Sequence, residues 1–503
     1  MTEKNVRKAG VLMPVSSLPS ECGIGTLGAG AYAFVDWLES AGMKIWQVLP
    51  LLPTGYGDSP YQSCASNALN YYFIDLPLLE KDGLLENSDY ADVCWGKDER
   101  RVDYGALFEK KVPVLEKAFA RFDKTNADWQ SFLRKKEYAD FATFMTLKRK
   151  FSYASWMDWA EPFKSCEGNL PESFYQENAE ELLFWQFTQY IFRKQWNALR
   201  QYAKLKGISI MGDMPIYLSE DSVETWKYRK KLFMLDKDGN LSLRAGVPPD
   251  AFSEDGQLWG NPVYDWEKLK KDGYAWWKQR MDYAFDTQFD IIRIDHFRAF
   301  DRFFAIPADA ETAKEGEWLD GPKAELFKGF ENAEIVAEDL GIIDDGVRAL
   351  LEETGYPGMK VFEFAFDGNP ENEYLPSNIV DGNCVAYTGT HDNDTLRSFI
   401  ESMDAPTRKA FAEKLESECL AADVPYITET TETECESIIE LLFSCKANTV
   451  ILPMHDVVCF GEEARLNAPS TLSSRNWTFR FTEKDFRRRK AAWLKELCQR
   501  YNR

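Results

Sequence analysis

Eight short apolar runs, each bounded by turn residues, recur along the chain and limit what it can fold into. They cover residues 10–15, 44–51, 207–217, 289–297, 333–341, 359–367, 383–394 and 448–456. Their Val, Ile and Leu content is nearly continuous, which is typical of parallel strands buried on both faces. Segments with helical periodicity separate the later runs, as at 268–285 and 344–354. The pattern predicts a (β/α)8 TIM barrel of the α/β class, with a doubly wound open sheet as the alternative.

The gap between the second and third runs is too long for a single crossover connection. It holds a turn-rich stretch and then charged amphipathic helices, one of which has apolar residues at i, i+4, i+7 and i+8: Leu183, Phe187, Tyr190 and Ile191. We therefore expect an inserted helical subdomain at 56–205 and a catalytic barrel formed by 1–55 and 206–480. Residues 481–503 should form a C-terminal helix packed on the barrel, which leaves no room for a C-terminal β-domain.

The composition narrows the possible partners and the compartment. The formal net charge of −22 repels phosphate backbones and anionic lipid, so nucleic-acid and membrane partners are disfavoured, whereas a neutral substrate is tolerated. The ten cysteines are scattered without a CxxC pair, which suits a reducing compartment. We find no signal peptide or membrane-spanning run and expect a cytoplasmic protein; the oligomeric state is left open.

Polar residues gather where the predicted strands end, which is where barrel enzymes place their chemistry. The third run ends at Asp213, the fourth at Arg293, Asp295 and His296, the fifth at Glu338, and the seventh at His391 and Asp392. All three histidines of the chain (296, 391 and 455) adjoin an aspartate at a strand end. The strand ends therefore aim several carboxylates at one mouth of the barrel.

Each of these carboxylates also has a structural interpretation, because an acidic residue at a strand end often caps the next helix. We expect Asp339 and Asp344, which lie beside turns, to be such caps. Glu363 and Asp367 on the sixth run fit either a barrel-mouth site or a solvated or capping role, and His455 is equally open.

Two carboxylates among aromatic residues suit glycoside chemistry. One attacks the anomeric carbon while the other, kept protonated by its surroundings, protonates the leaving oxygen; a retaining pair stands about 5–5.5 Å apart. Arg293 lies two residues before Asp295, on the same face of the strand, and would keep that carboxylate ionised. Histidines beside sugar hydroxyls can donate hydrogen bonds to them.

Several motifs give a family resemblance. RIDHFR (293–298), AEDLG (337–341) and THDND (390–394), in this order, resemble the conserved regions of the α-amylase clan. Further motifs narrow the resemblance to the 4-α-glucanotransferases of glycoside hydrolase family 77: SSLPSECGIGTLG, PTGYGDSPYQS, GDMPIY, GQLWGNPVYDW, ARLNAP and RNWTFR. The matches run from residue 16 to 480.

The resemblance implies a role for each matching residue. Asp295 matches the catalytic nucleophile, Glu338 the general acid/base and Asp392 the transition-state stabiliser. The supporting and glucan-binding positions match Arg293, His296, His391, Asp213, Tyr61, Trp259 and Asn467, with Asp250 on a mobile covering loop at 244–260. The implied partners are α-1,4-glucans and maltooligosaccharides, with no cofactor and no metal.

The sequence departs from the family pattern at three positions. His455 stands where Gln is expected, and Leu466 and Ala468 stand where Met and Thr are common. The role of His455 is therefore open, and donor-side contacts near residues 466 and 468 can differ slightly.

The sequence also offers a dinucleotide-binding motif and is compatible with three other functions. GIGTLG (23–28) matches GxGxxG, but it follows Ser-Leu-Pro-Ser rather than a strand, and the next run ends without the acid that a dinucleotide site needs. A metal-dependent barrel hydrolase, a non-catalytic glucan-binding protein and an α-glucan hydrolase using the same carboxylates are the alternatives. The preference for transfer over hydrolysis rests on the family resemblance.

Overall fold

Eight parallel strands form the central sheet of the protein, which we describe from a computed structural model for residues 6–55, 57–165, 167–249, 254–341 and 343–503. The strands are β1 (Lys8–Leu12), β2 (Ile45–Gln47), β3 (Ser209–Met214), β6 (Ile291–Ile294), β9 (Ile335–Ala337), β10 (Gly358–Val361), β11 (Cys384–Tyr387) and β12 (Thr449–Pro453). Each overlaps one of the eight predicted runs, in the same order. Neighbouring strands run in the order β10-β11-β12-β1-β2-β3-β6-β9.

The two end strands of this sheet meet and nearly close it into a barrel. The Ala337 N–H at the end of β9 donates to the Pro357 carbonyl, just before β10, at 2.9 Å. At the same seam Asp339 accepts a hydrogen bond from the Met359 N–H at 2.6 Å. The expectation that Asp339 caps a helix is therefore wrong, because its carboxylate instead binds the backbone of the neighbouring strand. The predicted barrel is confirmed.

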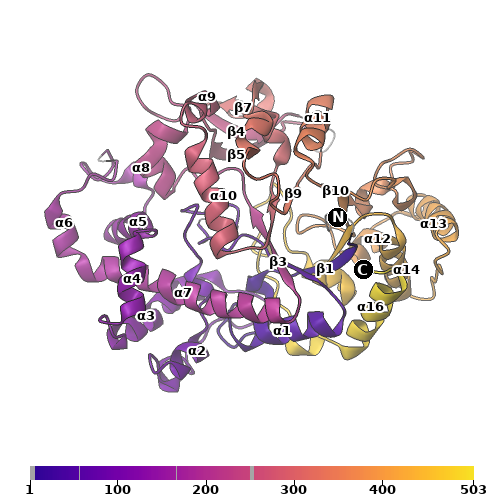
Figure 1. Ribbon diagram of the computed structural model, residues 1–503, viewed down its shortest axis with the longest axis horizontal. Coiled ribbons are helices and arrows are strands. Elements are labelled where there is room, and N and C mark those ends of the chain that lie inside the picture. Colours follow the sequence, from indigo (N-terminus) through magenta and orange to yellow (C-terminus); the bar gives the residue numbers. More distant parts are fainter. Residues whose placement is uncertain (1–5, 56, 166, 250–253, 342) are drawn as a thin grey trace.

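Helices surround the strands in the arrangement that Figure 1 shows. Up to β3 they are α1 (Ala29–Ser40), α2 (Leu76–Lys81), α3 (Tyr104–Arg121), α4 (Ala127–Lys135), α5 (Ala139–Lys150), α6 (Glu172–Glu177) and α7 (Ala179–Leu205). The later ones are α8 (Val223–Leu232), α9 (Trp266–Lys270), α10 (Ala275–Thr287), α11 (Asp345–Thr354), α12 (Leu396–Glu401), α13 (Ala405–Ala421), α14 (Thr431–Ser444), α15 (Met454–Val457) and α16 (Arg488–Arg500). Among the described residues, no helix is both long and apolar enough to cross a membrane.

The two segments with predicted helical periodicity, 268–285 and 344–354, are both helical, but the first is divided into two helices. Asp344 caps α11 as expected, accepting from the Val347 N–H at 3.1 Å. The segment at 268–285 forms two helices, α9 and α10, because Gly273 (φ 68°) and Tyr274 (φ 61°) are left-handed and turn the chain between them.

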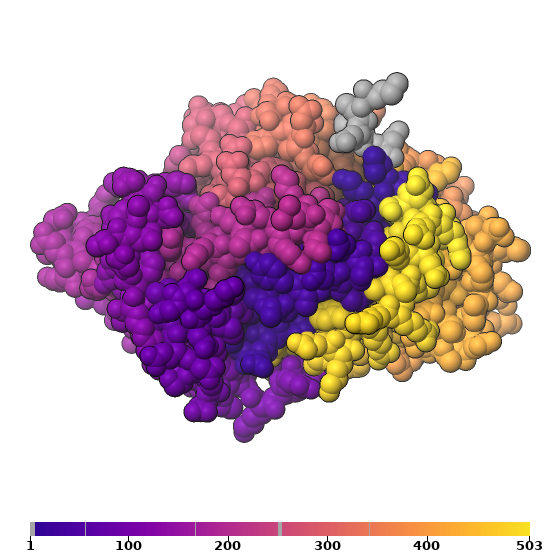
Figure 2. Space-filling view, turned by 60° about the horizontal axis from the view of Figure 1, so that its bottom comes forward, coloured from indigo at the N-terminus to yellow at the C-terminus, as the bar shows by residue number. Residues whose placement is uncertain are grey.

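The helices between β2 and β3 form a group beside the barrel, seen as the purple elements in Figure 1. The last of them, α7, also packs against α1 and β3. The boundaries of an inserted subdomain at 56–205 therefore stay a proposal. At the other end of the chain, α16 packs against α1 and α14, and Figure 2 shows this yellow segment lying beside the indigo N-terminal part.

A second, four-stranded antiparallel sheet was not expected. Its order is β5 (Gln257–Pro262), β4 (Leu243–Val247), β7 (Arg302–Pro307) and β8 (Glu317–Asp320), and its strands belong to the long connections after β3 and β6. Both ends of the predicted covering loop at 244–260 are strands of this sheet. Asp250 lies outside the described residues.

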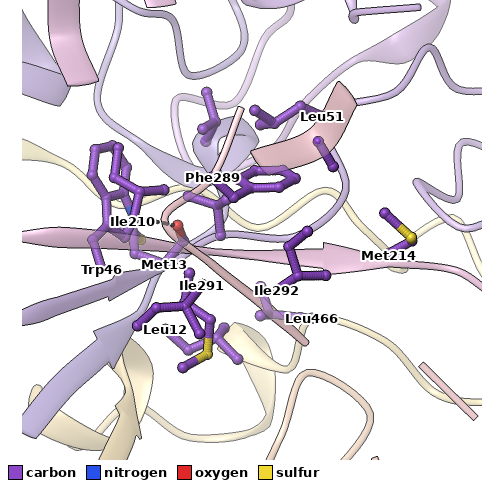
Figure 3. Packing of buried hydrophobic residues seen from close by; sticks show 14 of the residues in the cluster. Leu12, Met13, Trp46, Leu51, Ile210, Met214, Phe289, Ile291, Ile292 and Leu466 are labelled. Atoms are coloured by element: carbon purple, nitrogen blue, oxygen red, sulfur yellow. Dashed lines mark hydrogen bonds between the residues drawn. The ribbon is translucent and has the colours of Figure 1, made fainter. Parts of the chain in front are cut away.

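The core between the barrel strands is built from large apolar side chains. Figure 3 shows Trp46, Ile210, Phe289 and Ile292 packed closely, and each is at most 3% exposed. A Cβ atom on Gly212 would lie 2.2 Å from the Phe289 ring. A residue without a side chain is thus required at 212, immediately before Asp213.

Candidate active site

The turn after β6 brings Asp295 and Glu338 into one hydrogen-bonded unit. The Asp295 N–H donates to the Met214 carbonyl on β3 at 3.0 Å. His296 then takes a left-handed conformation (φ 50°), which few residues other than glycine adopt. Its N–H points to the next strand and donates to Glu338 Oε2 at 2.6 Å. The backbone that carries one carboxylate therefore orients the other.

Arg293 lies between two carboxylates inside the barrel. Its Nη1 donates to Asp213 Oδ1 and Oδ2 at 2.8 and 2.7 Å and to Asp295 Oδ1 at 3.1 Å. Burial opposes the charge on Arg293, but Asp213 and Asp295 outweigh it and raise the pKa of the guanidinium well above its usual value. The Asp213 side chain is 0% exposed, whereas that of Asp295 is 30% exposed. Asp295 is thus the partner of Arg293 that an external molecule can reach.

Glu338 is buried and chemically distinct from Asp295. Its Oε2 accepts from His296, and its Oε1 accepts from the Leu340 N–H at 2.8 Å. Burial and the nearby negative charge of Asp295 raise the pKa of Glu338 to about 8, against the opposing effects of Arg293 and the two N–H groups. At neutral pH this carboxyl group carries a proton that it can donate.

Tyr61 connects two sides of the site. Its hydroxyl donates to Asp213 Oδ2 at 3.0 Å, and its ring stacks on His391 with centroids 5.0 Å apart and planes 13° apart. The Trp477 ring lies 5.8 Å from both of these rings. Burial raises the pKa of the Tyr61 hydroxyl well above its usual value, so the group remains a hydrogen-bond donor.

Asp392 is held by residues from the end of the chain. Asn467 Nδ2 donates to Asp392 Oδ1 at 2.7 Å, and Arg465 Nη2 donates to the Asp392 carbonyl at 3.1 Å. His391 Nε2 lies 3.4 Å from Asp392 Oδ2. With a side chain 46% exposed, Asp392 is open to an incoming ligand.

His296 and Trp259 form an aromatic edge of the site. Their rings meet at 81° with centroids 4.8 Å apart, and Tyr217 lies 6.3 Å from Trp259 and 6.5 Å from His296. Burial lowers the pKa of His296 to about 4, so the imidazole is neutral at neutral pH. It can donate or accept a hydrogen bond without adding charge.

The described residues predicted for the site are joined by these contacts. One series of contacts runs through Asn467, Asp392, His391, Tyr61, Asp213, Arg293 and Asp295. A second runs through Glu338, His296 and Trp259, and the two are linked because His296 directly follows Asp295. His455 is buried, its Nε2 has no hydrogen-bond partner among the described residues, and burial lowers its pKa. None of these contacts involves His455. Leu466 is buried in the hydrophobic core (Figure 3).

Three residues of the site were not singled out from the sequence: Arg465, Trp477 and Tyr217. They lie in the motifs ARLNAP, RNWTFR and GDMPIY, so their neighbourhood was recognised. Their individual contacts were not, because the partners are distant along the chain; Arg465 and Asp392 are 73 positions apart.

Two alternative interpretations find little support in these residues. Within the described part of the chain, no three His, Cys, Asp or Glu side chains gather as metal ligands would. In GIGTLG, a Cβ atom on Gly28 would lie 2.0 Å from the Asp75 carboxylate. This negative charge lies next to the start of α1, where a dinucleotide site would need to accept a phosphate.

Known proteins resemble the whole chain. A family model described as 4-alpha-glucanotransferase matches residues 13–485. A 4-alpha-glucanotransferase of Clostridium butyricum is 41% identical over 500 residues, covering 98% of this chain and 100% of that protein. One from Streptococcus pneumoniae is 42% identical over 493 residues, covering 95% of this chain and 94% of that protein. The solved amylomaltase of Streptococcus agalactiae, in complex with acarbose, has a TM-score of 0.92 at 38% identity and covers 99% of both chains.

Proposed function

The chain belongs to the 4-alpha-glucanotransferase family and is a transferase, and we propose that it moves a segment of an α-1,4-glucan to the 4-hydroxyl of another glucan or of glucose. The reaction would be a retaining double displacement through a covalent glucosyl-enzyme. Relatives at about 40% identity over nearly the whole chain support the activity. The mechanism is proposed from the geometry around Asp295 and Glu338.

In the first step Asp295 is the nucleophile. Its carboxylate, partly exposed and paired with Arg293, attacks the anomeric carbon of the donor. The bond from that carbon to the leaving glycosidic oxygen breaks, and Glu338 gives its proton to the oxygen. A glucosyl ester on Asp295 and a shortened glucan with a free 4-hydroxyl result.

In the second step Glu338, now a carboxylate, takes the proton from the 4-hydroxyl of the acceptor. The acceptor oxygen attacks the anomeric carbon and Asp295 leaves as a carboxylate, so the configuration at that carbon is retained. Both groups return to their starting protonation states. Water in place of the sugar hydroxyl would give hydrolysis with the same carboxylates.

The surrounding residues would bind and orient the glucan. Asp392, fixed by Asn467, would accept hydrogen bonds from donor-ring hydroxyls, and His391 and His296 would form hydrogen bonds with further hydroxyls. Asp213 and Arg293 hold the nucleophile, while the Tyr61 and Trp259 rings provide flat faces for sugar C–H groups. Asp250, proposed for the covering loop, lies outside the described residues.

One observation carries the proposal. The His296 N–H donates a hydrogen bond to Glu338, and His296 directly follows Asp295, which is paired with Arg293. This arrangement holds the two carboxyl groups side by side, as retaining chemistry requires, while burial and the charge of Asp295 keep Glu338 protonated against the effect of that hydrogen bond. We also propose a cytoplasmic location, because the nine described cysteines are all free thiols, as is typical of a reducing compartment.

Incubation with maltotriose tests the function. We expect a ladder of shorter and longer maltooligosaccharides plus glucose, resolved by chromatography. Glucose and maltose as the only products would instead identify a hydrolase, and unchanged maltotriose would identify a binding protein. Asp295→Asn and Glu338→Gln are the matched inactive controls, because each replaces one oxygen of a reacting carboxyl group and keeps its size.

A further inference from the structure

The segment that carries His391 and Asp392 is fastened at both ends by one carboxylate. Asp456, in α15 and 1% exposed, accepts from Thr388 Oγ1 at 2.6 Å and from the Leu396 N–H at 2.7 Å. The ends of the 388–396 segment are therefore fixed. Its middle requires a separate support if Asp392 is to keep one position.

Asn393 closes a tight turn in the middle of this segment. Its Oδ1 accepts from the Thr390 N–H at 2.9 Å and from Thr390 Oγ1 at 2.8 Å. The Asp392 N–H in turn donates to Thr390 Oγ1 at 3.3 Å. Asn393 thus fixes the turn that carries Asp392, while Arg465 and Asn467 bond to Asp392 directly.

Glu363, from the turn after β10, supports Asn393. Its Oε2 accepts from Asn393 Nδ2 at 3.3 Å, and its N–H donates to the Thr388 carbonyl at 3.3 Å. Its Oε1 is buried, has no hydrogen-bond partner among the described residues, and would lie 2.9 Å from a Cβ on Gly389. The carboxyl group is therefore pressed against the backbone just before His391.

This carboxyl group is suited to being neutral. An ionised group with one unpaired buried oxygen is costly, and the negative charges of Asp456 and Asp394 add to that cost. Burial, then Asp456 and Asp394, raise the pKa of Glu363 well above its usual value, while Asn393 and Arg465 oppose the shift. A neutral Glu363 carboxyl accepts a hydrogen bond from Asn393 without adding a third negative charge to those of Asp456 and Asp394.

We propose that Glu363 is a positioning residue, which holds the 390–393 turn through Asn393 and thereby sets where the Asp392 carboxylate stands. The proposal rests on the proposed function, because Asp392 is the group that Glu363 positions. Glu363 makes no contact with the reacting carboxylates themselves. By contrast, Asp367 on the same run is exposed, and its carboxylate bonds to nearby residues of its own turn, Asn372 and the Asn369 N–H, the latter at 2.9 Å.

Three variants and a control test the proposal with maltotriose as donor and acceptor. Glu363→Gln keeps an acceptor for Asn393 and a neutral group, so kcat is expected to stay within about threefold of the wild-type value. Glu363→Ala removes the support, and a misplaced stabiliser is expected to lower kcat by about 10–100-fold, with little change in KM. Glu371→Gln, which changes an exposed carboxyl in the segment that follows, is the control and should be unchanged.

A folding defect in Glu363→Ala is distinguished by its melting temperature and by Glu363→Met. Methionine fills the space beside Gly389 and lacks only the acceptor, so the same loss of kcat is expected in a folded protein. A folded Glu363→Ala or Glu363→Met with wild-type kcat would overturn the proposal. So would a Glu363→Gln variant as slow as Glu363→Ala.

A double-variant cycle separates this inference from the proposed function. In an Asp392→Asn background, Glu363→Ala is expected to cause no further loss of rate, because the group it positions is already removed. Full additivity would overturn the positioning role while leaving Asp392 essential. A wild-type rate for Asp392→Asn alone would instead overturn the assigned role of Asp392, on which the inference depends.

Discussion

At the residue scale, the two central carboxyl groups differ because their surroundings differ. Asp295 is partly exposed and paired with Arg293, whereas Glu338 is buried with a pKa raised to about 8. The sequence predicted both residues from their position at strand ends. It also placed Arg293 on the same face as Asp295, because alternate residues of a strand point the same way.

The pKa of Glu338 leads to a prediction for pH dependence. A group with a raised pKa is protonated below that value, so a general acid of this kind is active below about pH 8 and loses its proton above it. We expect kcat/KM for maltotriose to fall about tenfold per pH unit well above pH 8. Steady-state rates from pH 6 to 10 measure this.

Glu363→Gln is the matched control for that experiment, because Glu363 is another carboxyl near the site with a raised pKa and makes no contact with the reacting groups. The variant should keep the alkaline decline if Glu338 is responsible. A rate that stays constant through pH 10 would argue against Glu338 as the acid, and a decline that disappears in Glu363→Gln would assign it to Glu363.

At the element scale, burial decided what could be predicted. The barrel strands are recognisable because they are short, apolar and buried on both faces. The strands β4, β5 and β8 are mixed in polarity and partly exposed, as in the exposed Leu258, so periodicity gave them no clear signal. The strand β7 (RFFAIP) is mostly apolar and buried and was missed nevertheless. The contacts of Tyr61 were equally inaccessible, because its hydroxyl meets Asp213 across 152 positions of sequence.

Gly212 offers a prediction at this scale. Its missing side chain lets β3 lie against Phe289, and a Cβ atom there would be 2.2 Å from the ring. Gly212→Ala is expected to lower the free energy of unfolding by about 1–3 kcal/mol and to reduce activity by displacing Asp213. Denaturant unfolding followed by maltotriose assays measures both effects.

Gly105→Ala is the control for the same substitution. A Cβ on Gly105, in the first turn of α3, would meet only the Asp103 carboxylate at 3.4 Å, an ordinary contact. This variant should be at least as stable as the wild type, since alanine favours a helix more than glycine does. Equal stability of Gly212→Ala and the wild type would show that β3 can shift away from Phe289.

At the scale of the whole molecule, the barrel collects its site from most of the chain. Asp213, Asp295 and Glu338 come from successive strand ends, Tyr61 lies in the long connection after β2, and Trp477 joins them from near the C-terminus. The net charge of −22 is compatible with this site because the proposed glucan substrate is neutral. The family was predictable from motifs in order along the chain, and the match over residues 13–485 agrees with it.

In the proposed mechanism Asp295 bonds to the anomeric carbon while Glu338 supplies and removes the proton. Mass spectrometry of Glu338→Gln incubated with α-maltosyl fluoride tests it most directly, because fluoride leaves without an acid and the missing base slows the second step. We expect a maltosyl adduct on the peptide containing Asp295, and no such adduct when Asp295→Asn is added. An adduct on another carboxylate would contradict this mechanism. So would transfer at the full wild-type rate by the protein that carries both substitutions.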